Sequence, residues 1–429
     1  MTVSSVRSSL RGSIMVPGSK SHTIRAVLLS ALSRGTSVIR NPVPSLDALS
    51  ALDAAEMFGS IVSRAPGLWT VTGPLPGLKL PDNYIDCGNS GSTAYFIASM
   101  AALVDGYTFI TGDEQIRRRP VKALLAALTE LGAEAFTSRP GVDACPVIIR
   151  GPMKGGTARL DGLLSQYVTS ILMSAPLLEN DTEILLKDPG EKPYLDMTLD
   201  WMKKYGVSVE KSADYKRFFV KGGQRYTPCD TTIASDWSGV AFPAVAALVS
   251  DSEITVDSID FNDTHGDKAV IDFLIQMGAD IEKDFANKRL IVRGGRTMKS
   301  GIRIDLRDTP DALPALAVAA AFAEGDTVFT GLAAVRLKET DRVKVMCCEL
   351  TKTGVRVESN ADTMTVYGGR RPRGTVIESH NDHRVAMAML ICGLASDGTT
   401  SVKDAGCASV SFPGFFEAME GLGASLKKE

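Results

Sequence analysis

The apolar residues of this chain follow a pattern that recurs six times. An amphipathic stretch with helical period ends in a glycine and leads into a short alternating apolar run; the copies end at Gly59, Gly132, Gly206, Gly278, Gly354 and Gly423. Successive glycines are 73, 74, 72, 76 and 69 residues apart. A glycine just after the last helical turn takes up a positive φ, which ends a helix with little strain. Because this period runs along the whole chain, it predicts a repeat architecture of six units.

A second, more uniformly apolar helix shares the period. These Ala-rich stretches begin at Ser, Asp or Asn and span residues 21–32, 89–103, 165–178, 236–249, 311–323 and 382–394. A helix that is apolar on every side is typical of a buried position, and the opening residues are good N-caps. Each one leads through a turn into a β-rich run, at residues 36–40, 107–111, 182–186, 252–256, 327–330 and 399–402. Each glycine-terminated helix is followed by a predicted hairpin, such as that in residues 207–221.

One unit therefore reads as helix, strand, helix, strand, strand, which predicts an α/β fold. The sixth unit lacks its last strand, and we expect Leu10–Val16 to supply it. Six units divide naturally into two domains of three, residues 17–234 and residues 1–16 plus 235–429. In each domain we expect three buried helices inside a coat of sheets, with the active site in the cleft between the lobes.

Composition and charge narrow the possible functions. The 429 residues carry 23% charged side chains and a net charge of −3, so no overall basic field favours nucleic acid. No run of 18 apolar residues predicts a membrane span, and the N-terminus has no apolar core of an export signal. The seven cysteines are scattered without metal-ligand spacing, which is typical of a reducing cytoplasm. We expect a cytoplasmic monomer without metal or cofactor.

The candidate chemistry lies where helices begin. The stretch Arg336–Arg342 contains three cations and two carboxylates, a composition that is usually a solvated surface. However, the segments 17–25, 117–120 and 381–384 also place cations at predicted helix starts. Helix N-termini attract anions and disfavour cations, so such cations need a ligand or an ion pair. Together these segments indicate a substrate with more than one anionic group.

Some residues at the helix starts have a purely structural alternative. Asp236, Ser238 and Asn89 could be N-caps without any functional role. His265 is interpreted as a turn residue, and His380 has no assigned role. The two interpretations of the caps stay open at this point.

The motifs at these positions resemble the 5-enolpyruvylshikimate-3-phosphate synthase (3-phosphoshikimate 1-carboxyvinyltransferase) family over essentially the whole chain. The similar segments are Pro17–Arg25, Cys87–Gly91, Arg119–Pro120, Lys192–Leu199, Pro310–Asp311, Lys338–Arg342, Asn381–Arg384 and Ser411–Pro413. The related UDP-N-acetylglucosamine enolpyruvyl transferases normally have Lys-Asn where this chain has Lys20-Ser21. The resemblance implies a two-domain inside-out α/β barrel, the enolpyruvyl transferase fold, with six βαβαββ units, three per domain.

The resemblance also implies a reaction and its residues. The family transfers the enolpyruvyl group of phosphoenolpyruvate to the 5-hydroxyl of shikimate 3-phosphate and releases phosphate, without a metal. Asp311, Glu339 and Lys20 would be the catalytic residues, the two carboxylates acting as acid and base. The donor would be bound by Lys20, Gly91, Arg119, Gln166, Arg342 and Arg384. The acceptor would be bound by Lys20, Ser21, Arg25, Ser165, Gln166, Tyr194, Asp311 and Lys338.

Four positions depart from the family pattern. Val410 stands where a Lys is usual before Ser-Phe-Pro, and Tyr95 where an Arg is usual. Leu164 and Glu191 stand where serines usually hold the acceptor's phosphate. Two alternatives therefore stay beside the first: a transferase acting on an unphosphorylated shikimate-like or other hydroxy-acid acceptor, and a non-catalytic anion-binding homologue.

Overall fold

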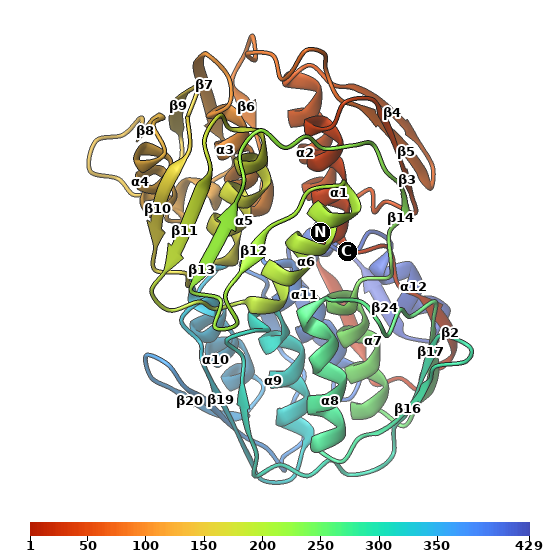
Figure 1. Cartoon of the computed structure of the whole chain (residues 1–429). Coiled ribbons are helices and arrows are strands. Elements are labelled where there is room, and N and C mark those ends of the chain that lie inside the picture. The colour runs from red at the N-terminus through yellow and green to blue at the C-terminus, as the bar shows by residue number, and fades with distance from the viewer. The chain divides into compact units, whose positions relative to one another are not determined.

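The computed structural model describes residues 1–429 and consists of helices and four-stranded sheets, whose order Figure 1 traces. The α-helices are α1 (Lys20–Leu32), α2 (Leu46–Met57), α3 (Gly91–Ala101), α4 (Lys122–Glu130), α5 (Ser165–Ser174), α6 (Lys192–Lys204), α7 (Trp237–Val249), α8 (Ala269–Gln276), α9 (Leu313–Phe322), α10 (Arg342–Lys352), α11 (His383–Gly393) and α12 (Phe415–Gly421). The buried and the glycine-terminated helices alternate along the chain as the sequence predicted. All six predicted glycines have positive φ.

The strands form six sheets of one topology. In sheet order, the three sheets built around helices α1 to α6 are β14 (Asp230–Thr232), β3 (Thr36–Arg40), β5 (Leu68–Thr72), β4 (Ile61–Ala65); β6 (Ile85–Asp86), β7 (Gly106–Thr111), β9 (Val147–Gly151), β8 (Glu134–Thr137); and β10 (Gly156–Leu160), β11 (Thr182–Leu186), β13 (Arg217–Val220), β12 (Glu210–Lys211). The other three are β16 (Asp280–Asp284), β17 (Arg289–Arg293), β15 (Glu253–Asp257), β2 (Arg11–Met15); β18 (Arg303–Asp305), β19 (Asp326–Thr330), β21 (Met364–Tyr367), β20 (Arg356–Ser359); and β22 (Val376–Glu378), β23 (Thr400–Lys403), β1 (Val3–Val6), β24 (Ser425–Lys428).

Each sheet combines one parallel pair with antiparallel pairs, and in five of the six sheets an antiparallel pair is a hairpin. In the second sheet β6 runs parallel to β7, and α3 forms the crossover between them, whereas β8 and β9 form the hairpin. A parallel pair needs such a crossover, and a hairpin does not. The predicted α/β fold of six βαβαββ units is confirmed.

The prediction for the N-terminal strand was wrong in its residues. The sixth sheet does receive a strand from the N-terminus, but that strand is β1, which pairs antiparallel with both β23 and β24. The predicted segment forms β2, which pairs in parallel with β15 of the fourth sheet. The apolar pattern did not reveal β1, because two of its four residues are serines. Both serines are hydrogen-bonded inside the fold: Ser5 Oγ donates to the Leu390 carbonyl at 3.0 Å, and Ser4 Oγ lies 2.8 Å from Ser401 Oγ.

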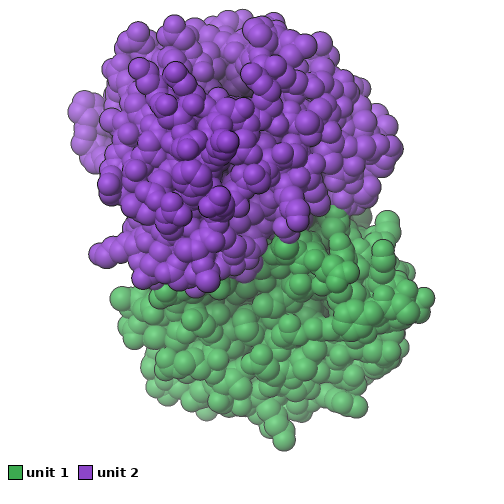
Figure 2. All heavy atoms as spheres, viewed as in Figure 1, with its two compact units in different colours: residues 1–19, 234–429 green, residues 20–233 purple.

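Two strands are exchanged between repeats. Strand β2 precedes α1 in the sequence but belongs to the fourth sheet, and β14 precedes α7 but lies parallel to β3 in the first sheet. The chain accordingly divides into two compact units, one of residues 1–19 with 234–429 and the other of residues 20–233 (Figure 2).

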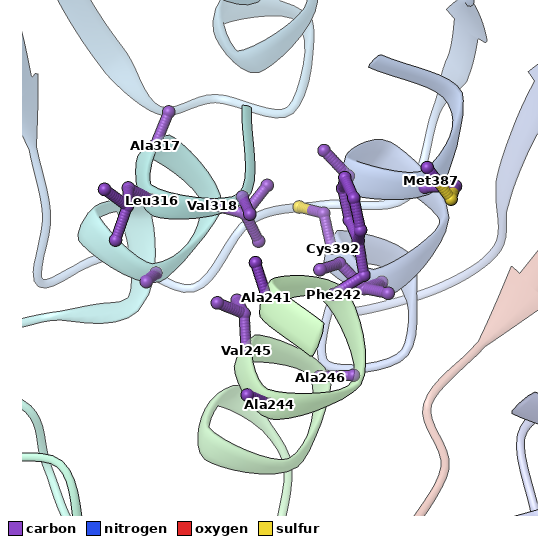
Figure 3. Packing of buried hydrophobic residues seen from close by; sticks show 14 of the residues in the cluster. Ala241, Phe242, Ala244, Val245, Ala246, Leu316, Ala317, Val318, Met387 and Cys392 are labelled. Atoms are coloured by element: carbon purple, nitrogen blue, oxygen red, sulfur yellow. The ribbon is translucent and has the colours of Figure 1, made fainter. Parts of the chain in front are cut away.

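Each unit is built on three buried helices. In the unit of residues 20–233 these are α1, α3 and α5, and in the other unit they are α7, α9 and α11. Figure 3 shows Val318 of α9, Ala241 of α7 and Cys392 of α11 facing one another in the latter core. Alanine at many of these positions lets three helices pack closely. None of the helices is both long and apolar enough to cross a membrane.

The glycine that follows α10 allows a test of the helix-ending rule. Gly354 has a φ of +88° and open space where a side chain would project, so Gly354→Ala changes only backbone strain. We expect a loss of about 1–2 kcal/mol in the free energy of unfolding. The control is Gly421→Ala at the end of α12, which also has open space but no positive φ. Urea unfolding midpoints check this; equal midpoints for both variants would contradict the assignment.

Candidate active site

In the unit of residues 20–233, the start of α1 places two cations against buried partners. Lys20 is the first residue of α1, and its Nζ lies 2.8 Å from Oδ2 of the buried Asp47 in α2. One turn later, Arg25 is almost fully buried and donates from Nε to Thr198 Oγ1 at 2.9 Å. Burial lowers the pKa of Arg25 to about 10, against the opposing effects of Tyr194 and Glu191. The cations at this helix start are therefore held in place by the fold.

Two further contacts fix the Arg25 side chain between helices. Its Nη1 donates to the Ser21 carbonyl at 3.1 Å, and its Nη2 donates to the Tyr194 carbonyl at 3.3 Å. The guanidinium also lies over the ring of Phe96, 5.1 Å from its centroid. Arg25, Ser21 and Tyr194, three predicted acceptor-binding residues, are thus brought together.

The start of α3 is shaped around Arg119. A Cβ on Gly91 would lie 2.2 Å from Nη1 of Arg119, so a larger residue here would force this buried guanidinium to move. The cap of α3 is Ser90, whose Oγ accepts from the Thr93 backbone at 3.2 Å. The alternative that Asn89 is the cap was wrong by one residue, because its side chain instead donates to Asp113 and Gln115.

Two tyrosines hold the carbonyl that follows Arg119. The hydroxyls of Tyr95 and Tyr167 both donate to the Pro120 carbonyl, at 3.1 and 2.5 Å, and their rings meet edge to face with centroids 5.0 Å apart. Burial raises the pKa of both phenols, which keeps them neutral donors. Tyr95, which replaces the usual Arg, therefore anchors the segment that carries Arg119.

The start of α5 is capped by a carboxylate from another element. Oε2 of Glu191 accepts from the backbone N of Ser165 at 2.9 Å and from its Oγ at 2.7 Å. Glu191 is 1% exposed and has a φ of +50°. The preceding Leu164 is buried and supplies no side-chain cap. A protein anion thus occupies the anion-attracting end of α5.

Gln166 connects α5 to α3. Its Nε2 donates to Ser92 Oγ at 2.9 Å, in the first turn of α3. Within this unit, the structure therefore places Gln166 beside the helix start that carries Gly91.

In the other unit, Arg342 lies at the centre of a buried ionic cluster. Its guanidinium is 0% exposed. Nη1 lies 2.7 Å from Oδ1 of Asp311, Nε lies 2.8 Å from Oδ2 of Asp382, and Nη2 bonds Oε2 of Glu339. Arg384 Nη2 also pairs with Asp311, at 3.1 Å. The structure therefore brings together four of the predicted site residues: Asp311, Glu339, Arg342 and Arg384.

The cations of this cluster control the protonation of Asp311. Burial raises the pKa of Asp311, but the charges of Arg384, Lys338 and Arg342 together lower it well below its usual range. Burial lowers the pKa of Arg342, but Asp382, Glu339 and Asp311 raise it by more, so that it lies above its usual value. Asp311 is thus a firmly ionised carboxylate held by arginines. An anionic ligand that takes over their hydrogen bonds would release it.

The solvated-face interpretation of the stretch Arg336–Arg342 was wrong for its C-terminal end. Arg342 is fully buried, and the Glu339 side chain is 10% exposed. The solvated-face interpretation fits Arg336 better, because Arg336 pairs with Asp341 at 2.9 Å near the surface. Asp341 also caps α10 through the Lys344 backbone.

Sequence reasoning missed several carboxylates that hold the cations. Asp382 is 0% exposed, caps α11 and forms two bonds to Arg342. Asp47 is the partner of Lys20. A signal in the sequence existed only for the partner of Lys20, because this cation lies at a predicted helix start with no acidic residue close to it in the sequence.

His265 does begin the 3-10 turn η3 (Gly266–Lys268), but it is also buried beside Asp236. Asp236 is the N-cap of α7, as the structural alternative predicted.

Val410 lies buried at the end of the 3-10 helix η6 (Ala405–Val410). His380, which had no assigned role, has Nε2 3.0 Å from Oε1 of the buried Glu349. These two positions add no charge to the ionic cluster around Arg342.

The chain is similar to known proteins over nearly its whole length. A family model described as EPSP synthase (3-phosphoshikimate 1-carboxyvinyltransferase) matches residues 5–419. A relative from Ruminiclostridium cellulolyticum, named 3-phosphoshikimate 1-carboxyvinyltransferase, is 42% identical over 98% of both chains. One of the same name from Acetivibrio thermocellus is 40% identical over 98% of both. The solved structure of an EPSP synthase from Acinetobacter baumannii superposes with a TM-score of 0.83 at 27% identity and covers 100% of both chains.

Removing the central cation tests the ionic cluster. Arg342→Met leaves three carboxylates without their shared partner, and one of them, Asp382, is fully buried, so we expect a loss of about 3–5 kcal/mol in the free energy of unfolding. The control, Arg356→Met, removes an ion pair whose side chains are 67% and 56% exposed, and about 1 kcal/mol or less is expected.

The effect of Arg342→Met depends on pH with a definite sign. The lowered pKa of Asp311 stabilises the folded protein at neutral pH, and that contribution is lost as the pH falls. The stability difference between wild type and Arg342→Met should therefore shrink below about pH 4. Urea unfolding at several pH values measures it; a difference independent of pH would contradict the assigned charges.

Proposed function

The chain belongs to the EPSP synthase (3-phosphoshikimate 1-carboxyvinyltransferase) family, whose activity it shares as an enzyme of the shikimate pathway, and we propose how its residues perform that reaction. The donor is phosphoenolpyruvate and the acceptor is the 5-hydroxyl of shikimate 3-phosphate. The hydroxyl oxygen loses its proton and bonds to the donor carbon that carries the phosphate, while the methylene carbon gains a proton, which gives a tetrahedral intermediate. The new methyl group then loses a proton, the bond from the central carbon to the phosphate oxygen breaks, and the carbon–carbon double bond forms again with release of phosphate.

The observation that carries the proposal is the buried Arg342 with both Asp311 and Glu339 ion-paired to it. Arg342 and Arg384 would bind the donor's carboxylate, for which a guanidinium offers bidentate geometry. The incoming carboxylate takes over hydrogen bonds that now hold Asp311, and the pKa of Asp311 then rises. Donor binding thereby converts an inert carboxylate into a proton acceptor.

The remaining roles follow the charges that the donor and acceptor carry. Arg119, Gln166 and Lys20 would hold the donor's phosphate, with Gly91 leaving the room that Arg119 needs. Ser21, Arg25, Ser165, Tyr194 and Lys338 would bind the acceptor. Glu339 would be the second acid–base group. The division into residues 17–234 and 1–16 plus 235–429, with the active site in the cleft between the lobes, remains part of this proposal.

The wider setting is also proposed. The chain would act in the cytoplasm as a monomer on these small molecules, without nucleic acid, membrane or cofactor. All seven cysteines are free thiols, which supports a reducing compartment. The intact cluster of Asp311, Glu339, Arg342 and Arg384 supports catalysis over a non-catalytic anion-binding role.

Phosphate release from phosphoenolpyruvate tests the reaction directly. Wild-type protein should release phosphate only when shikimate 3-phosphate is also present, and not with shikimate alone. Glu339→Gln should lower kcat roughly 10²–10⁴-fold, because it removes an acid–base group. Glu378→Gln, which alters an exposed pair with Lys403, is the matched control. Release that needs shikimate instead, or equal rates for both variants, would refute the assignment.

Glu191 is the observation that favours an altered acceptor pocket. Its buried carboxylate already occupies the N-terminus of α5, and a dianionic phosphate nearby would be repelled. Glu191→Gln keeps an oxygen for Ser165 but removes the charge. We expect the KM for shikimate 3-phosphate to fall about 10-fold, equivalent to roughly 1.4 kcal/mol.

Steady-state kinetics with Glu183→Gln as control check the Glu191 prediction. Glu183 pairs with Arg217 on β11 and β13, away from the start of α5. The control should leave the KM unchanged. An unchanged KM for Glu191→Gln as well would mean that the acceptor's phosphate does not approach this carboxylate.

A further inference from the structure

Helix α10 carries a buried carboxylate that has no part in the proposed reaction. The side chain of Glu349 is 0% exposed. Its Oε2 accepts from Lys352 Nζ at 2.6 Å and from the backbone N of Glu378 at 3.1 Å, and its Oε1 lies 3.0 Å from Nε2 of His380. A buried charge needs such partners, and two of the three belong to the segment that leads into α11.

The bond between Glu349 and His380 has a definite direction. Burial raises the pKa of Glu349, but the hydrogen bonds from Lys352 and His380 lower it by more, so the carboxyl group is ionised. An ionised carboxylate can only accept, and therefore His380 donates from Nε2.

The segment that Glu349 holds is a strained turn. His380 and Asn381 have φ of +53° and +56°, a left-handed conformation that residues other than glycine seldom adopt. Two bonds to Ser379 close the turn: its carbonyl accepts from the Asp382 backbone at 3.0 Å, and its Oγ accepts from the Asn381 backbone at 3.1 Å. Strained backbone persists only where its surroundings hold it, and the bond from His380 to Glu349 is such a hold.

The strained turn leads directly to the ionic cluster. Asp382 follows the turn, caps α11 and bonds Arg342, with Oδ2 2.8 Å from Nε and Oδ1 3.2 Å from Nη2. Oδ1 of Asp382 also accepts from the backbone of Arg384 at 3.0 Å. Asp382 thus bonds one guanidinium directly and the backbone of the residue that carries the other.

Helix α10 holds this segment at two points. Arg342 is the first residue of α10, and Glu349 lies seven residues further on. Seven residues are close to two helical turns, so the two side chains leave the same face of α10 about 10 Å apart. Arg342 bonds Asp382 after the turn, whereas Glu349 bonds Glu378 before it and His380 within it. One helix therefore fixes the turn on both sides.

We propose that Glu349 is a positioning residue that holds the turn of residues 379–381 and so sets the spacing of Arg342 and Arg384 for the donor's carboxylate. This inference rests on the proposed function, in which these two arginines bind that carboxylate. Guanidinium groups bind a carboxylate well only where their fork geometry matches it, so a turn that relaxes displaces Arg384 from Arg342 and weakens donor binding.

Kinetics of Glu349→Met and Glu349→Gln test the proposal. Methionine fills the space without a strong acceptor, whereas glutamine can still bond both the Glu378 backbone and His380. We expect Glu349→Met to raise the KM for phosphoenolpyruvate about 10-fold with kcat unchanged, because substrate and transition state lose the same binding. Glu349→Gln should restore most of this loss. A lower Tm with unchanged KM in Glu349→Met, or an equal rise in KM in both variants, would overturn the proposal.

The matched control is Lys352→Met. Lys352 bonds the same oxygen of Glu349 as the Glu378 backbone does, and its side chain is 35% exposed. Because the bonds from Glu349 to the turn stay in place, we expect an unchanged KM for phosphoenolpyruvate. A rise equal to that of Glu349→Met would overturn the proposal.

A variant on the turn itself avoids any change to the core. The side chain of His380 is 41% exposed, so His380→Ala keeps the fold and the strained φ but loses the bond to Glu349. We expect the KM for phosphoenolpyruvate to rise in this variant too. An unchanged KM would overturn the proposal, even if Glu349→Met does not fold.

Hydrogen exchange separates this inference from the proposed function, because it needs no turnover. The backbone N–H groups of Glu378 and Asp382 should exchange faster in Glu349→Met than in wild type, and not in Lys352→Met. Unchanged exchange overturns the hold on the turn whether or not the protein is active. If exchange quickens but Arg384→Gln leaves the KM for phosphoenolpyruvate unchanged, the proposed role of Arg384 fails and the hold on the turn stands.

Discussion

A fully buried guanidinium is the constraint on which the rest of the candidate site depends. Arg342 is surrounded by Asp382, Asp311 and Glu339, so one cation faces three carboxylates. Such a cluster is stable only if each charge keeps its partner, since an unpaired buried charge costs several kcal/mol. Arg384 supplies a second cation to Asp311. The cluster therefore gives Asp311 two guanidinium partners, one from α10 and one from α11.

The repeat architecture could be predicted because its signals are local. Each glycine that ends a helix, such as Gly206 with a φ of +82°, is recognised from its own neighbours in the sequence. The pairing of β1, β2 and β14 could not be predicted in the same way. Strand order depends on partners up to about 425 residues away, as in Val3 opposite Lys428, and three- to five-residue strands carry little information about that choice.

The candidate site, like the fold, could be predicted only where its signals are local in the sequence. The cations were found because a charge such as Lys20 or Arg384 at a helix start contradicts the helix dipole. The pairing of Asp382 with Arg342 was missed, because Asp382 also satisfies the sequence rule for an N-cap and needed no other explanation. Glu191 was noticed only as a departure from the family pattern. Its bond to Ser165 depends on a tertiary contact that the sequence does not encode locally.

The exchange of β2 and β14 has a consequence for the order in which the protein can fold during synthesis. The first sheet lacks an edge strand until Asp230–Thr232 has left the ribosome, although β3 lies within the first forty residues. Strand β2 has to wait for β15, and β1 has to wait for the last residues of the chain. The earliest segment to be made is thus among the last to be paired. A nascent chain of this protein therefore keeps unpaired strand edges exposed for most of its translation. Such edges are the kind of surface that chaperones bind.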